Sequence, residues 1–279
     1  MESLEPGLCR DIVRRALAED LGWGDVTTQA AIPPETRATG VLVARSSVVV
    51  AGLDAALEAF RQLDPTVTMT ADRHDGDLCG PDDRLATVSG LAAPLLTAER
   101  TALNFLRHLS GVATLTRQFV DASAGRIQIA DTRKTLPLLR ALQKYAVRAG
   151  GGVNGRLTLD EGVILKANHL HIAGGVRTAV ERVRAAHTDL PVQVEIASAI
   201  EAIEALDGGA AVIICGASRL DLVREAVRLC AGRARVEVSG TISLDQIAEL
   251  AATGADFVSI GLLTESASAA DITFDLRPV

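Results

Sequence analysis

The sequence predicts an α/β protein in which a parallel sheet, closed or nearly closed into a barrel, follows a smaller domain of helices and strands. After Gly125, short apolar segments rich in β-branched residues alternate with segments of helical period, as in parallel sheets covered by helices. The length of 279 residues also leaves room for a barrel and a second domain. The expected strands are 127–130, 162–165, 192–194, 211–214, 235–238 and 257–260.

The first third of the chain carries the signals of the smaller domain. Apolar residues at helical spacing predict a helix over 4–21, which Gly22 and Gly24 end. Strand patterns follow at 39–44, 47–52 and 85–90, with an amphipathic helix over 53–63. A long helix is expected over 96–111, where Arg100 lies either on an exposed face or directed into a site.

The composition predicts a soluble globular protein of the cytoplasm. The net charge is −7, 48% of the residues are hydrophobic, and no apolar run reaches the roughly 18 residues of a membrane span. The first residues lack the basic and then apolar pattern of a signal peptide. The four cysteines have no C-x-x-C spacing, so neither a zinc site nor a disulfide framework is expected. The acidity argues against nucleic acid as a partner, and no membrane partner is expected.

A cationic turn follows the strand at 127–130. Arg133 and Lys134 lie where a barrel binds its substrates, at the carboxyl end of a strand, and Pro137 is expected to begin a helix. The arginine offers a planar fork for a carboxylate or phosphate, and the lysine offers a point charge. The turn is therefore either an anion clamp or a solvated basic loop. Gly150 and its two following glycines are expected to end the helix.

The residues that leave the later strands complete a predicted binding mouth. Lys166 and Glu195 follow the second and third strands, and small residues follow the others. Backbone N–H groups in such turns suit a phosphate, although β–α loops also use glycine for geometry alone. The expected phosphate-binding residues are Ser239, Gly240, Thr241, Gly261 and Leu262.

Three long motifs resemble the quinolinate phosphoribosyltransferase family. They are E-R-T-A-L-N-F-L-R-H-L-S-G-V-A-T over 99–114, D-T-R-K-T-L-P-L-L-R-A-L-Q-K-Y-A-V-R-A-G-G-G-V-N over 131–154, and S-I-G-L-L-T-E-S over 259–266. The likeness extends over nearly the whole chain. It implies an N-terminal α/β sandwich domain, residues 1–112, to which residues 270–279 return, and an incomplete α/β barrel domain, residues 113–269. It also implies a homodimer, or a higher oligomer, with an active site shared across the interface.

The implied reaction is a pentosyl transfer of NAD biosynthesis. Quinolinate and phosphoribosyl pyrophosphate give nicotinate mononucleotide, carbon dioxide and pyrophosphate, and Mg²⁺ is expected with the pyrophosphate. The resemblance implies that Arg100, reaching across the dimer, holds the dicarboxylate, and that Lys134 meets phosphate and Glu195 the ribose hydroxyls. The remaining implied substrate-binding residues are Thr132, Arg133, Arg156, Lys166 and His169, and the implied catalytic residues are Lys134, Lys166 and Glu195.

Five positions inside the implied site depart from the family pattern. Ala167 and Gly216 each replace an aspartate, and Gly155 and Glu265 each replace a histidine. Thr241 replaces a glycine. Loss of one charge-assisted hydrogen bond at a transition state costs on the order of 10²-fold in rate. The changes weaken the expectation of Mg²⁺ and leave three hypotheses, namely the family reaction, a different reaction or substrate at the same carboxylate pocket, and a non-catalytic subunit.

Overall fold

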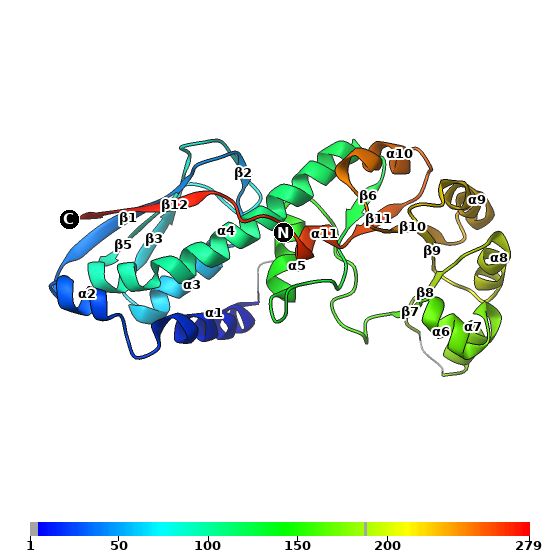
Figure 1. Cartoon of the computed structure of the whole chain (residues 1–279), viewed down its shortest axis with the longest axis horizontal. Helices are drawn as coiled ribbons and strands as arrows, with labels where there is room; N and C mark the ends of the chain where they lie inside the picture. The colour runs from blue at the N-terminus through cyan, green and yellow to red at the C-terminus, as the bar shows by residue number, and fades with distance from the viewer. Residues whose placement is uncertain (1–4, 187–188) are drawn as a thin grey trace. The chain divides into compact units, whose positions relative to one another are not determined.

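The computed structural model describes residues 5–186 and 189–279, which divide into two compact units (Figure 1). The first unit comprises the described residues up to Arg117, Leu136–Gly151 and Ser266–Val279. The second comprises Gln118–Thr135 and the described part of Gly152–Glu265. The boundary expected at residues 112 and 113 falls within the helix α4 (Ala92–Ser123). The segment Leu136–Gly151, expected in the barrel, belongs to the first unit.

The first unit is built on an antiparallel sheet of strand order β12-β1-β5-β3. The C-terminal strand β12 pairs with β1 along its whole length, from Ala44 opposite Ile272 to Ala38 opposite Pro278. A two-stranded ribbon of β2 and β4 accompanies the sheet. The strands are β1 (Arg37–Ala44), β2 (Val48–Val49), β3 (Thr68–Ala71), β4 (Leu78–Cys79), β5 (Arg84–Leu91) and β12 (Ile272–Pro278).

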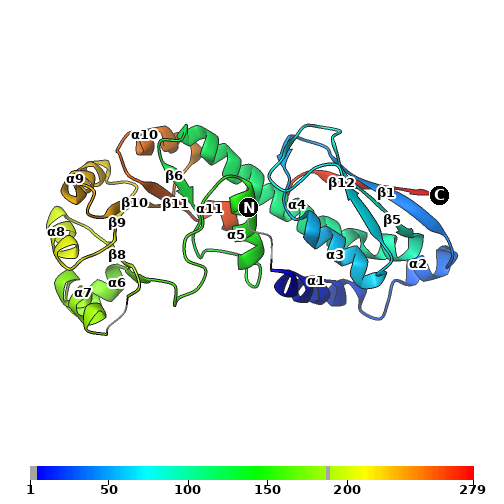
Figure 2. The ribbon, with the colours of Figure 1, turned by 180° about the vertical axis from the view of Figure 1, so that it is seen from behind.

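Helices cover this sheet and bury its apolar side chains (Figure 1 and Figure 2). The ring of Phe60 in α3 lies 5.3 Å from that of Phe274 in β12. Gly40 in β1 provides the room, because a Cβ there would lie 2.0 Å from the Phe274 ring. The helices of the unit are α1 (Pro6–Leu21), α2 (Val26–Ala31), α3 (Leu53–Leu63), the first part of α4, and α5 (Arg140–Ala149).

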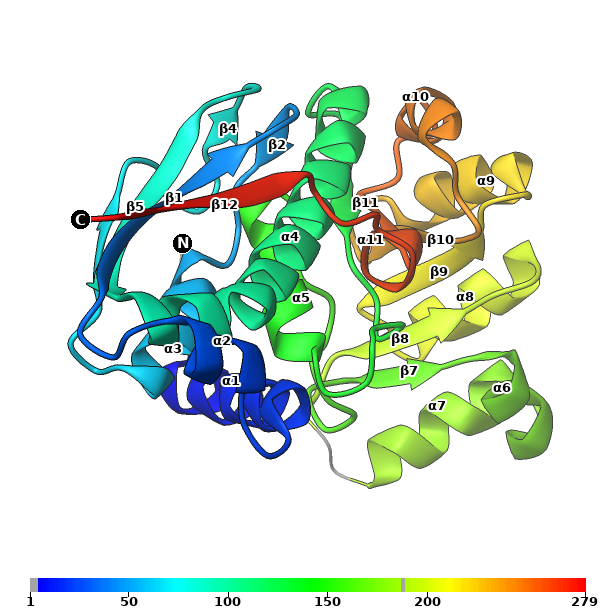
Figure 3. The same cartoon turned by 60° about the vertical axis from the view of Figure 1, so that its left-hand side comes forward.

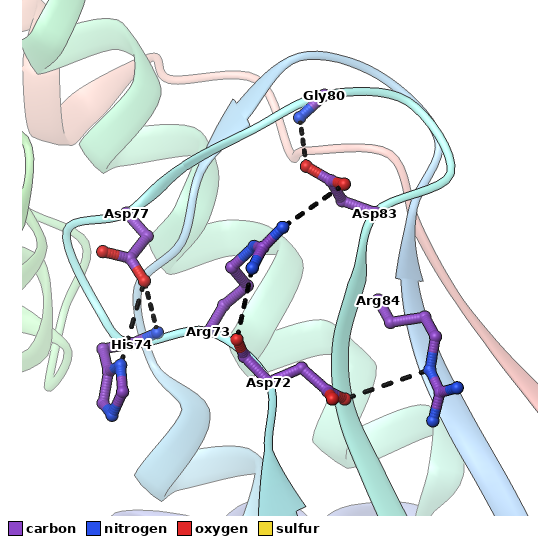
Figure 4. A network of polar contacts seen from close by, with 7 residues as sticks. All are labelled: Asp72, Arg73, His74, Asp77, Gly80, Asp83 and Arg84. Atoms are coloured by element: carbon purple, nitrogen blue, oxygen red, sulfur yellow. Dashed lines mark hydrogen bonds and ion pairs between the residues drawn. The ribbon is translucent and has the colours of Figure 1, made fainter.

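A polar network fixes the loops between β3 and β5 (Figure 4). Arg73 lies 3.5 Å from Asp83, whose other oxygen accepts the Gly80 N–H at 2.8 Å. Asp77 likewise accepts the His74 N–H at 2.8 Å. These contacts are part-buried or exposed, and we assign them a role in loop shape with little effect on stability.

The second unit is a six-stranded parallel sheet of order β6-β11-β10-β9-β8-β7. All six strands expected from the sequence are present. Among the described residues, β6 and β7 form the two edges and do not pair with each other, so the barrel is incomplete. Their bounds are β6 (Gln128–Ala130), β7 (Val163–Leu165), β8 (Val192–Glu195), β9 (Val212–Gly216), β10 (Arg235–Gly240) and β11 (Phe257–Ile260).

Amphipathic helices connect these strands, and Figure 3 shows α7, α8 and α9 side by side along the sheet. Their apolar faces supply buried residues such as Val180, Ala205 and Val223. The helices are α6 (Ala167–Ala173), α7 (Val176–Ala185), α8 (Ala199–Asp207), α9 (Leu220–Cys230), the 3₁₀ turn η1 (Leu244–Gln246), α10 (Ile247–Ala251) and α11 (Leu262–Glu265).

One helix start differs from the sequence prediction. Pro137 does not begin the helix, because α5 starts three residues later at Arg140. Leu138 takes a left-handed φ of 65°, which is incompatible with an α-helix at that point. The predicted end of this helix is confirmed, since Gly150 is its C-cap and Gly151 has a φ of 91°.

Across residues 5–186 and 189–279, no helix has both the length and the apolar character needed to cross a membrane.

Candidate active site

The carboxyl ends of the six parallel strands meet at one edge of the second unit. Gly216 at the end of β9 lies opposite Ser239 in β10, and Ser239 lies opposite Ser259 in β11. Ser259 in turn lies opposite Ala130, the last residue of β6. The loops that carry most of the predicted site residues therefore start from adjacent positions, as expected for a barrel mouth.

Asp131 joins the two loops at the β6 edge. It is 2% exposed, and its carboxylate accepts hydrogen bonds from the side chain of Asn154 at 2.6 Å and from the N–H of Gly155 at 2.8 Å. Gly155 permits this approach, because a Cβ there would lie 3.1 Å from the Asp131 carbonyl oxygen. The loop that follows β6 and the loop before β7 are thus held together at their bases.

These loops bring Arg133 and Arg156 close to each other. Burial lowers the pKa of Arg156, and the positive charge of Arg133 lowers it further. The Arg156 guanidinium donates to the Gly162 carbonyl at 2.7 Å, while its buried Nε has no hydrogen-bond partner among the described residues. Two neighbouring guanidinium groups repel each other, so the arrangement favours a bound anion with two acceptor groups.

Lys166 and His169 lie together at the start of α6. Lys166 is the N-cap residue, in extended conformation after β7, and its N–H donates to Nδ1 of His169 at 3.1 Å. The His169 ring therefore caps this helix, which fixes the backbone of Lys166. Both side chains are exposed at the mouth.

Glu195 ends β8 and borders a cavity of about 490 Å³. Ala167 at the start of α6 and Glu201 in α8 also line this cavity. Glu201 accepts the Ala197 N–H at 2.5 Å, which shapes the loop after Glu195. The Glu195 carboxylate therefore borders an open volume at the mouth.

A buried carboxylate, Glu237, which the sequence patterns did not predict as a site residue, lies inside the sheet beneath the mouth. It is 8% exposed and accepts a hydrogen bond of 2.5 Å from the Ser259 hydroxyl. Burial raises the pKa of Glu237, and the negative charge of Glu195 raises it further. The hydrogen bond from Ser259 and the positive charge of Lys166 act in the opposite direction. An acidic residue within the apolar strand V-E-V was the signal that could have identified it.

The turn after β10 brings Gly240 close to Ala217. Gly240 has a φ of 155°, and a Cβ there would lie 3.3 Å from the Ala217 side chain. The Ser239 carbonyl accepts the Ala217 N–H at 3.0 Å, and Thr241 is exposed directly after this turn. Nothing lies within 4 Å of a Cβ built at Gly216, where the family pattern has an aspartate.

The turn after β11 packs against Lys134. A Cβ at Gly261 would lie 2.8 Å from Cδ of Lys134, so glycine leaves room for the lysine side chain against this turn. The Thr264 hydroxyl donates to the Lys134 carbonyl at 2.6 Å, and the Lys134 N–H donates to the Thr132 hydroxyl at 3.0 Å. Leu262 begins α11 on the exposed side of the turn.

Arg100 lies in α4, within the first unit. It borders a cavity of about 360 Å³ in the first unit, together with Asp20 and Asp25. Burial raises the pKa of the neighbouring Glu99, and the charge of Arg100 lowers it. Trp23 in the adjacent loop is fully exposed.

The side chains present fit a magnesium ion only if the substrate supplies most of its ligands. In the part of the chain that the structure describes, no three His, Cys, Asp or Glu side chains gather as a metal site. At the mouth, Glu195 is the carboxylate at a strand end, while Ala167 and Gly216 offer no side-chain oxygen. Mg²⁺ commonly binds through one or two carboxylates and substrate phosphates, and this arrangement suits such a mode.

Comparison with known proteins assigns the chain to a family. The model of the quinolinate phosphoribosyl transferase C-terminal domain matches residues 112–275, and that of the N-terminal domain matches residues 25–110. The chain belongs to the quinolinate phosphoribosyltransferase family. It is 43% identical to the carboxylating nicotinate-nucleotide pyrophosphorylase of Mycobacterium leprae, over 96% of each chain.

Solved structures of this family share the fold throughout. The chain covers 100% of NadC from Streptococcus pyogenes and is itself fully covered, with a TM-score of 0.96 and 37% identity. The nicotinate-nucleotide pyrophosphorylase of Francisella tularensis gives a TM-score of 0.94 at 33% identity, covering 99% of this chain and 98% of that one. The resemblance seen in the three sequence motifs is therefore confirmed at the level of family and fold.

Proposed function

We propose that the protein transfers the phosphoribosyl group of phosphoribosyl pyrophosphate to quinolinate and releases carbon dioxide, pyrophosphate and nicotinate mononucleotide. The observation that carries the proposal is that Asp131 joins the loops of Arg133 and Arg156 at the strand-end mouth, where the charge of Arg133 lowers the pKa of Arg156. The glycine turns at Gly240 and Gly261 lie on the same edge. A dicarboxylate and a sugar phosphate thus have separate places within one mouth.

The two arginines hold the ring carboxylates of quinolinate. Two guanidinium forks bind two carboxylates in fixed orientation, and the repulsion between the arginines decreases when the dianion arrives. Asp131 keeps both loops in place through Asn154 and Gly155. Lys166 stands at the next strand end and adds a third positive charge.

The phosphate groups of the second substrate lie at the β10 and β11 turns. Backbone N–H groups next to Gly240 and Gly261 suit the 5′-phosphate, with Ser239, Thr241 and Leu262 beside them. Lys134, held across Gly261, meets the pyrophosphate. Glu195 accepts hydrogen bonds from the ribose hydroxyls. Oriented groups of this kind stabilise the charge that develops on the leaving pyrophosphate.

The reaction balances without a redox cofactor. The pyridine nitrogen forms a bond to C1 of the ribose as the bond from C1 to the pyrophosphate oxygen breaks. The positively charged ring then releases the carboxylate at C2 as carbon dioxide, and the electron pair left on C2 takes a proton. The neighbouring ring nitrogen stabilises that electron pair, so the chain has only to bind, orient and exclude water.

We include Mg²⁺ as a partner of the pyrophosphate. Glu195 is the residue that would hold it, and the ion would neutralise the charge of the departing group. Because residue 216 offers no side-chain oxygen, substrate oxygens and water would supply the remaining ligands.

The active form in this proposal is a homodimer in which Arg100 of one subunit serves the pocket of the other. Arg100 shares its cavity with a loop that exposes Trp23, and an exposed tryptophan is typical of a surface that is covered in an assembly. Mixing equal amounts of the Arg100→Ala and Arg133→Ala variants tests this. Random exchange of subunits gives hybrid dimers with one intact site each, and the mixture should then have about a quarter of wild-type activity. Activity no greater than that of either variant alone would contradict the shared site.

We place the reaction in NAD biosynthesis in the cytoplasm. The relatives described above carry the name of one activity, which favours it over another reaction at the same pocket. All four cysteines, Cys9, Cys79, Cys215 and Cys230, are buried free thiols, as in a reducing compartment.

The test of the function is product formation. The purified protein is incubated with quinolinate, phosphoribosyl pyrophosphate and Mg²⁺, and nicotinate mononucleotide is measured by chromatography. We expect product that depends on all three, and none without phosphoribosyl pyrophosphate. Absence of product from a folded protein that binds quinolinate would contradict the proposal.

A further inference from the structure

Glu265 lies beside the residue that the proposed function assigns to pyrophosphate. A Cβ built at Gly261 would have Cδ of Lys134 at 2.8 Å and Oε1 of Glu265 at 3.4 Å. The two side chains therefore flank the same backbone turn. Glu265 is exposed at the end of α11, and Lys134 is exposed in the loop after β6.

The backbone around both residues is fixed, so their proximity is built into the fold. Thr132 accepts the Lys134 N–H, and Thr264 donates to the Lys134 carbonyl. The N–H of Glu265 donates to the Gly261 carbonyl at 3.1 Å, which closes the short helix. The Nζ of Lys134 is two bonds beyond Cδ, and rotation of the last two side-chain torsions brings it within reach of the Glu265 carboxylate.

A carboxylate in this position competes with phosphate for the lysine. Both are anions, and a single ammonium group cannot give a full set of hydrogen bonds to each. A bound pyrophosphate would also be repelled by Glu265 at close range. Glu265 therefore weakens the binding of phosphates and leaves the binding of the dicarboxylate at Arg133 and Arg156 unchanged.

We propose that Glu265 is an internal counter-anion of Lys134 that the pyrophosphate of the substrate must displace, and that it thereby sets the affinity of the site for pyrophosphate compounds. This inference rests on the proposed function for the identity of the anion. It makes Glu265 a specificity-determining residue, since it weakens the retention of simple phosphates that lack the remaining substrate contacts.

Calorimetric titration of the protein with inorganic pyrophosphate, with and without Mg²⁺, tests the inference. Glu265→Gln keeps the size of the side chain and removes its charge. We expect it to bind pyrophosphate roughly fivefold more tightly than wild type at low salt, which is the scale of an exposed ion pair. Glu181→Gln, the same change at an exposed position on α7, is the matched control and should bind as wild type does.

A double-mutant cycle shows whether the effect passes through Lys134. In a Lys134→Met background, which keeps the aliphatic chain over Gly261, Glu265→Gln should change pyrophosphate affinity by less than about twofold. Equal affinity of wild type and Glu265→Gln would overturn the inference, and so would a gain that persists in Lys134→Met or absence of pyrophosphate binding in every variant.

The two proposals fail separately in these experiments. Tighter pyrophosphate binding by Glu265→Gln in a protein that makes no nicotinate mononucleotide would support the counter-anion and contradict the reaction. Product formation with unchanged pyrophosphate affinity would support the reaction and contradict the counter-anion.

Discussion

The side-chain amide of Asn154 donates a hydrogen bond of 2.6 Å to the carboxylate of Asp131. This contact joins the loop that carries Arg133 to the loop that carries Arg156. The carboxylate is almost fully buried, so the bond is protected from water and holds the spacing of the two guanidinium groups. In the proposed function, the pair thereby determines whether a dicarboxylate meets both arginines at once.

Asn154→Ala should weaken quinolinate binding without direct contact between residue 154 and the substrate. Loss of a hydrogen bond to a charged group is worth about 1.5–3 kcal/mol, and we expect KM for quinolinate to rise roughly tenfold or more. KM for phosphoribosyl pyrophosphate should change by less than about threefold, because its phosphates lie at other turns. Steady-state kinetics with each substrate varied in turn provide the measurement, and equal increases in both constants would argue against a positioning role.

Lys134→Ala should raise KM for phosphoribosyl pyrophosphate more than KM for quinolinate, the reverse of Asn154→Ala. The lysine lies across Gly261 at the β11 turn, so its loss removes a contact to pyrophosphate and leaves the arginine pair in place. We expect KM for phosphoribosyl pyrophosphate to rise by about 10²-fold, with little change for quinolinate. If the same kinetic assay gives the same change for both substrates, the role given to Lys134 is wrong.

Gly216→Asp should restore a carboxylate at the mouth without disturbing the fold. No atom lies within 4 Å of a Cβ at this position, so the side chain has room. A second carboxylate near Glu195 should lower the Mg²⁺ concentration that gives half-maximal activity, by about threefold or more. Titration of Mg²⁺ at fixed substrate concentrations checks this. An unchanged Mg²⁺ requirement in a variant with wild-type thermal stability would show that residue 216 does not face the ion.

Glu237→Gln should change how stability depends on pH. Burial raises the pKa of the Glu237 carboxyl above its ordinary value of 4.5, so the folded state holds this proton more tightly than the unfolded state does. The stabilisation is therefore complete below the ordinary value, and it is lost as pH rises from there through the raised pKa. The glutamine variant has no such loss and retains an acceptor for the Ser259 hydroxyl.

The melting temperatures of wild type and Glu237→Gln provide the measurement across pH 4 to 8. We expect the melting temperature of the variant to rise relative to that of wild type as pH rises. At the acidic end the two melting temperatures should be closest, or that of the variant should be the lower. Groups common to both proteins cancel in this difference. A difference that stays constant over the range, or that decreases with rising pH, would contradict a raised pKa at Glu237.

The sheet of the second unit could be predicted because its physical signal is local. Continuous β-branched segments such as Val212–Gly216 are typical of strands buried on both faces. The start of α5 could not be predicted, because Leu138 takes a left-handed φ that is rare for leucine. Pro137 instead occupies the second position of a turn in which the Leu139 N–H donates to the Leu136 carbonyl at 3.2 Å.

The candidate site was predicted in part for the same reason. Residues that leave strands, such as Arg133 and Glu195, follow from the strand assignment alone. Contacts between distant segments do not, and the roles of Asp131, Glu237 and Thr264 emerged only from the structure. Arg100 belongs to the first unit, and its role at the site stays a prediction.

The most direct measurement is the stoichiometry of products from quinolinate labelled with ¹³C at the carboxylate on C2. The account predicts one labelled carbon dioxide and one pyrophosphate for each nicotinate mononucleotide, with no labelled carbon dioxide when phosphoribosyl pyrophosphate is left out. Labelled carbon dioxide released without phosphoribosyl pyrophosphate, or quinolinate bound and returned unchanged in the complete mixture, would contradict it.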